Sequence, residues 1–379
     1  MQSGQDGTSN PGTRDPNEAY RNRQIFHGQS LHMTVRVSRF PVQIFPCAIL
    51  VLLFLAGICT VSAHAPLSVG SNEDLGNATL ISNPEKSFAI YTELHTGNEA
   101  QYYRFPMQKG QILSGSLGVP GPDAMVPDLV LIGPGIDPAG AVPSFITIPA
   151  GSGARLVPGT RPGKPTYEPF SPQPLYKTAD FNITVPSDGT YYIAVYGTGG
   201  GNYYLAPGFL EQFTVTEQLL IPWSVVGIHL WQGQSLPEIF APMIVVLIAG
   251  VVAIALRRKK EGAWPDSPAL LVLLSGLLYI GGAAMTAYQV IRSVSVTGYT
   301  PDVLITLVLI AAPALLGIAA IVIGTRSLRA GFPLRTGIAM LLIGIFGLLA
   351  WAGLILGPVL AMAGGVFIIA RRIRKSGDG

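Results

Sequence analysis

The second half of this 379-residue chain alternates long apolar runs with short groups of basic residues. The first run, residues 239–256, stops at four consecutive basic residues, and the last run stops at residues 371–375, of which four are basic. Apolar runs of about 20 residues match the hydrocarbon thickness of a bilayer, and basic residues mark its cytoplasmic side. Only 12% of all residues are charged, against about 25% in an ordinary soluble domain. The pattern predicts an integral membrane protein.

The stretch 336–370 is too long for one crossing and short for two full crossings at about 20 residues each. Basic residues flank both of its ends, so we expect two crossings with a turn near Gly357-Pro358 and a cytoplasmic tail at 372–379. This topology makes residues 64–238 extracellular and leaves only Arg292 on an outer loop. The expected transmembrane bundle, 239–371, then has five helices, at 239–256, 268–290, 303–324, 336–353 and 358–370.

Residues 33–63 have the pattern of a secretory signal peptide. Arg36 and Arg39 precede an apolar core, and small residues lead up to Ala63. We expect cleavage after Ala63, and an uncleaved signal anchor is the alternative.

Residues 1–32 are polar and show no apolar periodicity. They are interpreted either as a disordered extension or as sequence upstream of a true start at Met33. Both cysteines, Cys47 and Cys59, lie in the signal segment. Its removal would leave a mature chain without disulfides or thiol chemistry.

Residues 64–216 are expected to form an extracellular β-sandwich. Residues 64–238 hold fourteen Asp and Glu against seven Lys and Arg, a net charge of −7, which argues against nucleic acid as a partner. Short strand-like runs recur between turn residues, which is typical of an antiparallel sandwich. The runs are 87–91, 101–105, 128–132, 181–185, 190–196, 202–205 and 212–216.

Two stretches resemble one family. Residues 98–105 (NEAQYYRF), followed by Lys109-Gly110-Gln111, and residues 186–196 (PSDGTYYIAVY) are similar to the opening and closing of the pre-peptidase C-terminal (PPC) domain of bacteria and archaea. The resemblance covers residues 85–206 and implies a non-catalytic, jelly-roll-like accessory module. The family has an acidic pair before its two aromatic residues, whereas Gln101 replaces one acid here. The resemblance therefore carries no calcium site over to this chain.

Two further segments have two interpretations each. Residues 151–180 are rich in proline, with basic and aromatic side chains, and are expected to be a loop that serves either function or surface decoration. Residues 217–238 are interpreted as an interfacial linker, because Trp223 and Trp231 precede a span and tryptophan favours the headgroup level. The alternative for this linker is a last strand followed by a loop.

A copper site is one hypothesis for the chemistry of the domain. Cleavage after Ala63 would give His64 a free α-amine beside its imidazole, and His95 is the candidate for a second imidazole; such nitrogen ligands favour Cu(II). Alternatively, His64 is a remnant of the cleavage site and His95 a surface residue. Asn77 and Asn182 open N-glycosylation sequons.

No catalytic constellation is recognisable in the sequence, so we expect no enzymatic activity. The apolar cores hold no ionisable residue, which weighs against transport. We expect a plasma-membrane protein whose sandwich binds an envelope polymer or a partner protein. A membrane subunit of a larger complex and a copper-binding surface module are the alternatives.

Overall fold

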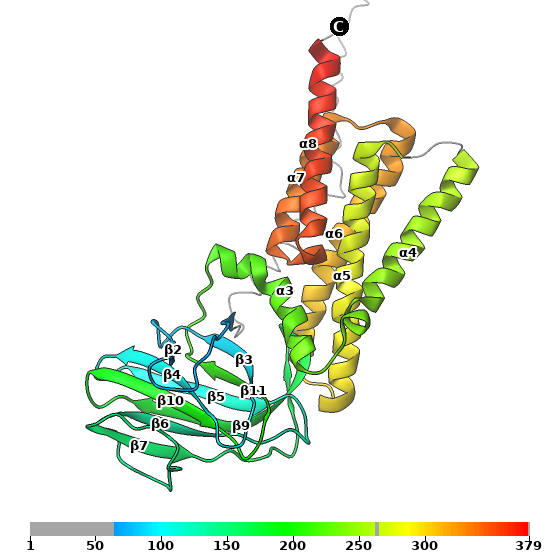
Figure 1. Ribbon diagram of the computed structural model, residues 1–379. Helices are drawn as coiled ribbons and strands as arrows, with labels where there is room; N and C mark the ends of the chain where they lie inside the picture. Colours follow the sequence, from blue (N-terminus) through cyan, green and yellow to red (C-terminus); the bar gives the residue numbers. More distant parts are fainter. Residues whose placement is uncertain (1–63, 262–264, 378–379) are drawn as a thin grey trace, which may run out of the picture. The chain divides into compact units, whose positions relative to one another are not determined.

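A computed structural model describes residues 64–261 and 265–377. Two β-sheets are followed by a region of apolar helices (Figure 1), which confirms the predicted sandwich and helical bundle. The described residues all belong to one compact unit. The expected signal peptide, the segment before it and both cysteines lie outside the described residues.

The strands form one six-stranded sheet, in the order β1-β3-β11-β5-β9-β8, and one five-stranded sheet, in the order β2-β4-β10-β6-β7. Pairing is antiparallel except where the two-residue strands β1 and β2 join β3 and β4. The bounds are β1 Ala65–Pro66, β2 Thr79–Leu80, β3 Phe88–Leu94, β4 Ala100–Met107, β5 Ile112–Val119, β6 Asp128–Pro134, β7 Ser152–Val157, β8 Thr166–Glu168, β9 Gln173–Thr184, β10 Gly189–Tyr196 and β11 Gly201–Pro207.

Strand alternation builds the sandwich core. In β10, Tyr191, Ile193 and Val195 enter the core between the sheets, whereas Ala194 and Tyr196 belong to a second apolar cluster. That cluster also contains Ile146, so the outer face of the five-stranded sheet is covered by the chain between β6 and β7. The six-stranded sheet is the one that faces the helices.

The expectation of a loop at residues 151–180 is wrong. This stretch contains β7, β8 and the first half of β9, where β7 pairs with β6 and β8 pairs with β9. The prolines lie mainly between these strands. The strands form because their partners, some of them far away in the sequence, supply the backbone hydrogen bonds.

The predicted strand at 212–216 is also wrong, as is the strand-and-loop alternative for the linker. Helix α3, Val215–Trp231, begins in this stretch. Thr214 Oγ1 accepts a hydrogen bond from Glu217 N at 3.2 Å, and the Glu217 carboxylate accepts one from Thr214 N at 2.7 Å. This capping box satisfies amides at the helix start that have no partner within the helix.

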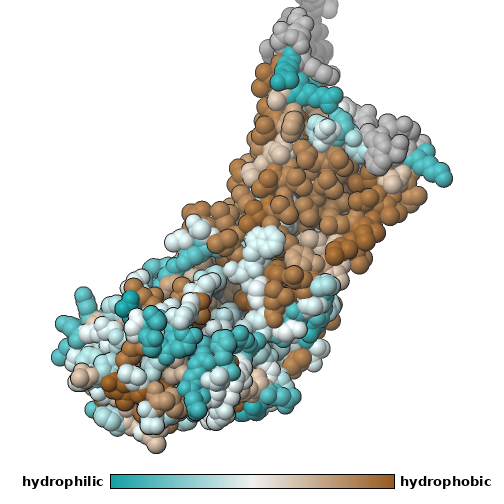
Figure 2. Space-filling model, in the orientation of Figure 1, coloured by the Kyte–Doolittle hydropathy of each residue, from teal (hydrophilic) through white to brown (hydrophobic). Residues whose placement is uncertain are grey.

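Four helices of the described chain are long and apolar enough to cross a membrane, within α4, α5, α6 and α8. Figure 2 shows the apolar surface that covers them. Helix α7 has 16 residues, about 24 Å of helix, which is shorter than a hydrocarbon core of about 30 Å. The bounds are α4 Leu236–Glu261, α5 Ser267–Thr297, α6 Val303–Ala330, α7 Leu334–Leu349 and α8 Leu356–Gly377.

Helices α7 and α8 form an antiparallel hairpin. Gly337 lies against Ile369 at one end of the pair, and Gly344 lies against Met362 nearer the turn. The turn comes before the expected Gly357-Pro358 and contains a short 3₁₀ helix, η1, Ala352–Leu354. Pro358 instead lies in the first turn of α8, where a missing backbone N–H costs no helical hydrogen bond.

Arg292 does not lie on an outer loop. It lies on α5, near the C-terminal end of that helix, and forms an ion pair with Glu238 of α4. The contact connects the ends of two helices that follow one another in the chain.

Candidate binding groove

The outer face of the six-stranded sheet has a covered half and an open half. In the covered half, the Trp231 ring of α3 packs edge-on against Tyr91 at 4.9 Å, and Trp231 Nε1 donates to Thr92 O at 3.0 Å. Tyr204 and Leu175 complete this apolar cluster. The open half lies over β5 and β9 and is polar.

The open half forms a shallow groove of about 520 Å³, here called the β5–β9 groove. Its polar residues are Ser114 and Ser116 on β5, Lys177, Asp180 and Asn182 on β9, and His64 before β1. Ser114 is paired with Asn182 and Ser116 with Asp180 in the strand register. Paired residues point to the same face of a sheet, so these four side chains face outward together.

A bulge adds Lys177 to the same face. The register between β5 and β9 shifts between Leu117 and Gly118, which places Lys177 opposite Gly118. A bulge inserts one residue and changes the alternation of side chains beyond it. Lys177 and Asp180 therefore both face outward, with Nζ and Oδ1 3.4 Å apart.

The base of the groove contains Gly115 and Ala206. A Cβ atom at Gly115 would lie 2.5 Å from the Ala206 carbonyl oxygen and 2.6 Å from the Phe181 ring. Only glycine fits at this position, because the carbonyl oxygen is backbone and cannot move aside. The missing Cβ of Gly115 thus allows close packing towards Phe181 in the sandwich core, and Ala206 adds little bulk at the base of the groove.

His64 and His95 are not brought together. His64 Nδ1 hydrogen-bonds to Ser87 Oγ immediately before β3, whereas His95 follows the last residue of that strand. Ser87 and His95 are eight residues apart, about 26 Å along an extended chain. Burial first, and then the charge of Lys177, lower the pKa of His64. Within residues 64–261 and 265–377, no group of three or more His, Cys, Asp or Glu could hold a metal ion.

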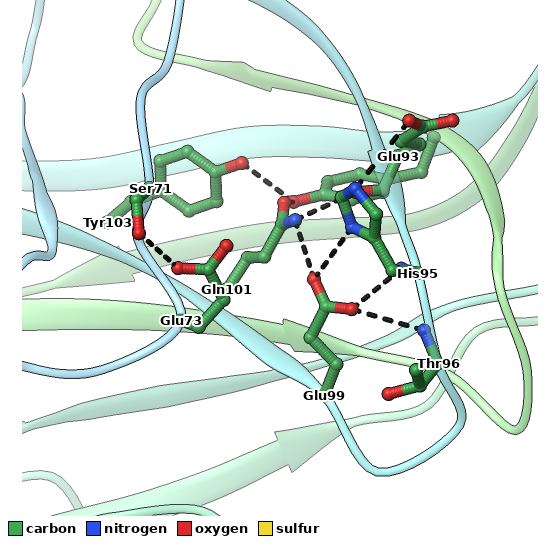
Figure 3. A network of polar contacts seen from close by, with 9 residues as sticks. Ser71, Glu73, Glu93, His95, Thr96, Glu99, Gln101 and Tyr103 are labelled. Carbon is green, nitrogen blue, oxygen red and sulfur yellow. Dashed lines mark hydrogen bonds and ion pairs between the residues drawn. The ribbon is translucent and has the colours of Figure 1, made fainter.

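His95 belongs to a polar network at the start of the segment that resembles the PPC domain (Figure 3). The Glu99 carboxylate accepts hydrogen bonds from His95 N at 2.6 Å and from Thr96 N at 3.1 Å. Partial burial raises the pKa of Glu99, but the hydrogen bonds from His95, Gln101 and Thr96 lower it by more, so the net shift is downward.

Gln101 is buried at the centre of this network. Its Nε2 donates to Glu93 O at 2.7 Å and to Glu99 Oε1 at 2.9 Å, while its Oε1 accepts from Tyr203 Oη at 2.6 Å. A glutamate could not supply the two donated hydrogen bonds. The amide therefore fits a structural role at this position, with its donors and acceptor all used.

The two sequons lie in different settings. Asn77 is exposed in the chain before β2, and its Nδ2 donates to Asp74 Oδ2 at 3.0 Å. Asn182 is exposed on β9 and lines the β5–β9 groove. A glycan on Asn182 would occupy the groove.

Of the groove residues, Asn182 and His64 are recognisable as candidates from the sequence, whereas the others are not. Strand β5 was not expected, although residues 112–117 carry apolar side chains at 113 and 117 with Ser114 and Ser116 between them. Glycine at 115 interrupts this alternation, so the sequence pattern does not predict a strand here.

The chain matches no protein-family model, and a search of the curated proteins found no match. The resemblance to the PPC domain therefore stays a prediction from its two motifs.

Proposed function

We propose that this protein is a membrane-anchored cell-surface protein whose sandwich binds a polar polymer of the cell envelope without catalysing a reaction. The observation that carries the proposal is the β5–β9 groove. It presents hydroxyl, amide, ammonium and carboxylate groups on the open half of a sheet whose other half is covered by α3.

The chemistry of the groove favours a neutral ligand with many hydroxyl groups. Lys177 and Asp180 are close enough to offset each other's charge, so the pair does not select a simple anion or cation. The serine hydroxyls and the Asn182 amide each donate and accept hydrogen bonds. A polysaccharide chain is such a ligand: it can be uncharged, it carries many hydroxyl groups, and these groups both donate and accept hydrogen bonds.

The anchoring supports a role at the cell surface. Helix α3 holds the sheet through Trp231, and β8 contacts the helices through Tyr167, which packs with Val290 of α5 and Val303 of α6. The sandwich is thus fixed to its anchor on two sides rather than attached by the linker alone.

The charge distribution supports an extracellular sandwich and a cytoplasmic C-terminus. The net charge of −7 lies before the first span, and basic groups form the last turns of α4 and of α8. Basic residues next to spans favour the cytoplasmic side. The resemblance to a non-catalytic accessory module agrees with a binding role.

The test is co-sedimentation of the detergent-solubilised full chain with insoluble envelope polysaccharide. We expect the double variant Asp180→Ala, Asn182→Ala to bind about thirtyfold more weakly, since two lost hydrogen bonds of about 1 kcal/mol each have that effect. The matched control is Asp137→Ala, whose side chain is 96% exposed and lies outside the groove. Equal binding by all three proteins would contradict the proposal, and so would a glycan found on Asn182 by mass spectrometry.

A further inference from the structure

A cavity of about 100 Å³ lies between α3, α5, α6 and the turn that joins α7 to α8. Apolar side chains form most of its wall, including Ile221, Val225 and Val226 of α3, Met285 of α5 and Leu309 of α6. A second cavity of about 60 Å³ shares Phe170, Ile221, Val225 and Trp351 with the first. We call the first the junction cavity.

Small residues keep the junction cavity open. Gly282 and Ala283 of α5 line it, together with Ala350, Ala352 and Gly353 of the α7–α8 turn. Protein interiors are normally packed as densely as organic crystals, with few voids larger than a water molecule. Space of this size beside two membrane helices indicates room for a ligand.

The backbone beside the cavity is strained. Trp351 and Leu354, both in the wall, have φ values of 51° and 55°, and Ile355 has 70°. Non-glycine residues rarely adopt such values, and where they do the strain is concentrated at ligand clamps and switch regions. This second observation, independent of the cavity volume, marks the turn as part of a site.

The cavity also contains buried polar groups. His229 of α3 is 2% exposed, and its Nδ1 lies 3.4 Å from Gln232 Oε1. Burial is the main reason why the pKa of His229 is lowered to about 4; the hydrogen bond to Gln232 raises it and the charge of Arg292 lowers it further. The imidazole is therefore neutral at pH 7. Gln289 forms two hydrogen bonds with Gln234, of 3.0 and 2.8 Å.

We propose that the junction cavity binds a hydrocarbon chain of a bilayer lipid, an uncharged hydroxyl group of which donates a hydrogen bond to His229. The surrounding surface favours this occupant over a soluble one. Leu220 and Trp223 of α3 expose apolar side chains, as do Leu304 and Val308 of α6. Two of the helices that line the cavity thus also expose apolar surface that suits a membrane, where lipid is the most abundant partner.

The size of the cavity agrees with a hydrocarbon ligand. A dry cavity of about 150 Å³ lined by aliphatic and aromatic side chains binds benzene. The junction cavity is somewhat smaller and has a neighbour that shares four wall residues. A short length of acyl chain fits these dimensions.

The experiment uses the full chain in phosphatidylglycerol and phosphatidylethanolamine vesicles that contain a phospholipid with a diazirine in its acyl chain. After irradiation, we expect labelled peptides from α3 and from the α7–α8 turn. Ala283→Leu should fill the cavity and lower this labelling about tenfold, a change of about 1.4 kcal/mol in binding free energy. Labelling of the exposed face of α4 should not change.

The matched control is Ala253→Leu, which adds the same atoms at an exposed position on α4. A second variant, Val226→Phe, fills the cavity from α3. It tests the proposal even if Ala283→Leu fails to fold. Equal labelling of the α3 and turn peptides in wild type and in both folded filling variants would overturn the proposal.

Discussion

Tyr167 of β8 donates its hydroxyl hydrogen to Thr306 Oγ1 of α6, with 2.8 Å between the two oxygens. Thr306 is fully buried and donates in turn to Pro169 O at 2.7 Å. The two bonds connect a strand of the sandwich to a helix that is long and apolar enough to span a membrane. They connect the proline-rich segment around β8 directly to α6.

The first prediction concerns this connection. Thr306→Val keeps the side-chain shape but leaves the Tyr167 hydroxyl and the Pro169 carbonyl without a partner, which should cost about 1–3 kcal/mol. We expect faster proteolysis between β8 and β9 and a lower melting temperature. Thr325→Val is the control, because among the described residues Thr325 Oγ1 bonds to Val322 O of its own helix and to no other element. Identical behaviour of the two variants would contradict this role of Thr306.

The second prediction separates the two tryptophans of α3. Trp231→Ala removes the ring that packs on Tyr91 and the hydrogen bond to Thr92 O, and should destabilise the protein by about 3–5 kcal/mol. Trp223 is 45% exposed on the same helix, so Trp223→Ala should change the melting temperature little in detergent. Thermal unfolding followed by near-UV circular dichroism measures both. A larger loss for Trp223→Ala would show that α3 is held differently.

The third prediction concerns pH. Burial chiefly raises the pKa of Glu168 to about 7; a hydrogen bond from Phe170 N lowers it, and the nearby Asp302 raises it further. The folded state then holds more protons than the unfolded state between about pH 4.5 and 7, so stability falls as pH rises through this window. Glu168→Gln should therefore stabilise the protein at pH 8, by up to about 3 kcal/mol, and have little effect at pH 4.5.

Unfolding of wild type and variant across this pH range, with Asp137→Asn as the exposed control, isolates the contribution of Glu168. If the difference in unfolding free energy between wild type and Glu168→Gln does not change with pH, the Glu168 carboxyl group does not titrate in this range.

The fourth prediction concerns topology. Because basic groups form the last turns of α4 and of α8, cysteine introduced as Asp137→Cys should react with a membrane-impermeant maleimide in intact cells, and a reporter fused after Lys375 should be cytoplasmic. Lys259→Cys, at the end of α4, is the protected control. A cytoplasmic reporter requires α7 and α8 to enter and leave on the same side. An outward reporter would mean that the hairpin does not cross twice.

Sequence alone determined the features that depend on local composition. The long apolar runs around 239–370 become helices for two reasons. Their side chains suit hydrocarbon, and a helix lets the backbone N–H and C=O groups hydrogen-bond within the segment. The aromatic and β-branched runs that became β3, β4, β6, β10 and β11 were recognisable for the same local reason, since such residues favour a half-buried pleated surface.

Tertiary structure decided what depends on distant partners. Strand β5 and the first half of β9 are weak strands by themselves, and their pairing with each other creates the groove. The contact of β8 with α6 joins Tyr167 to a residue 139 positions away. Likewise, the separation of His64 from His95 follows from the length of β3, so the two-imidazole copper site gains no support from the geometry. Local patterns carry no information on such placements, because a side chain's neighbours across a sheet come from strand register rather than from sequence distance.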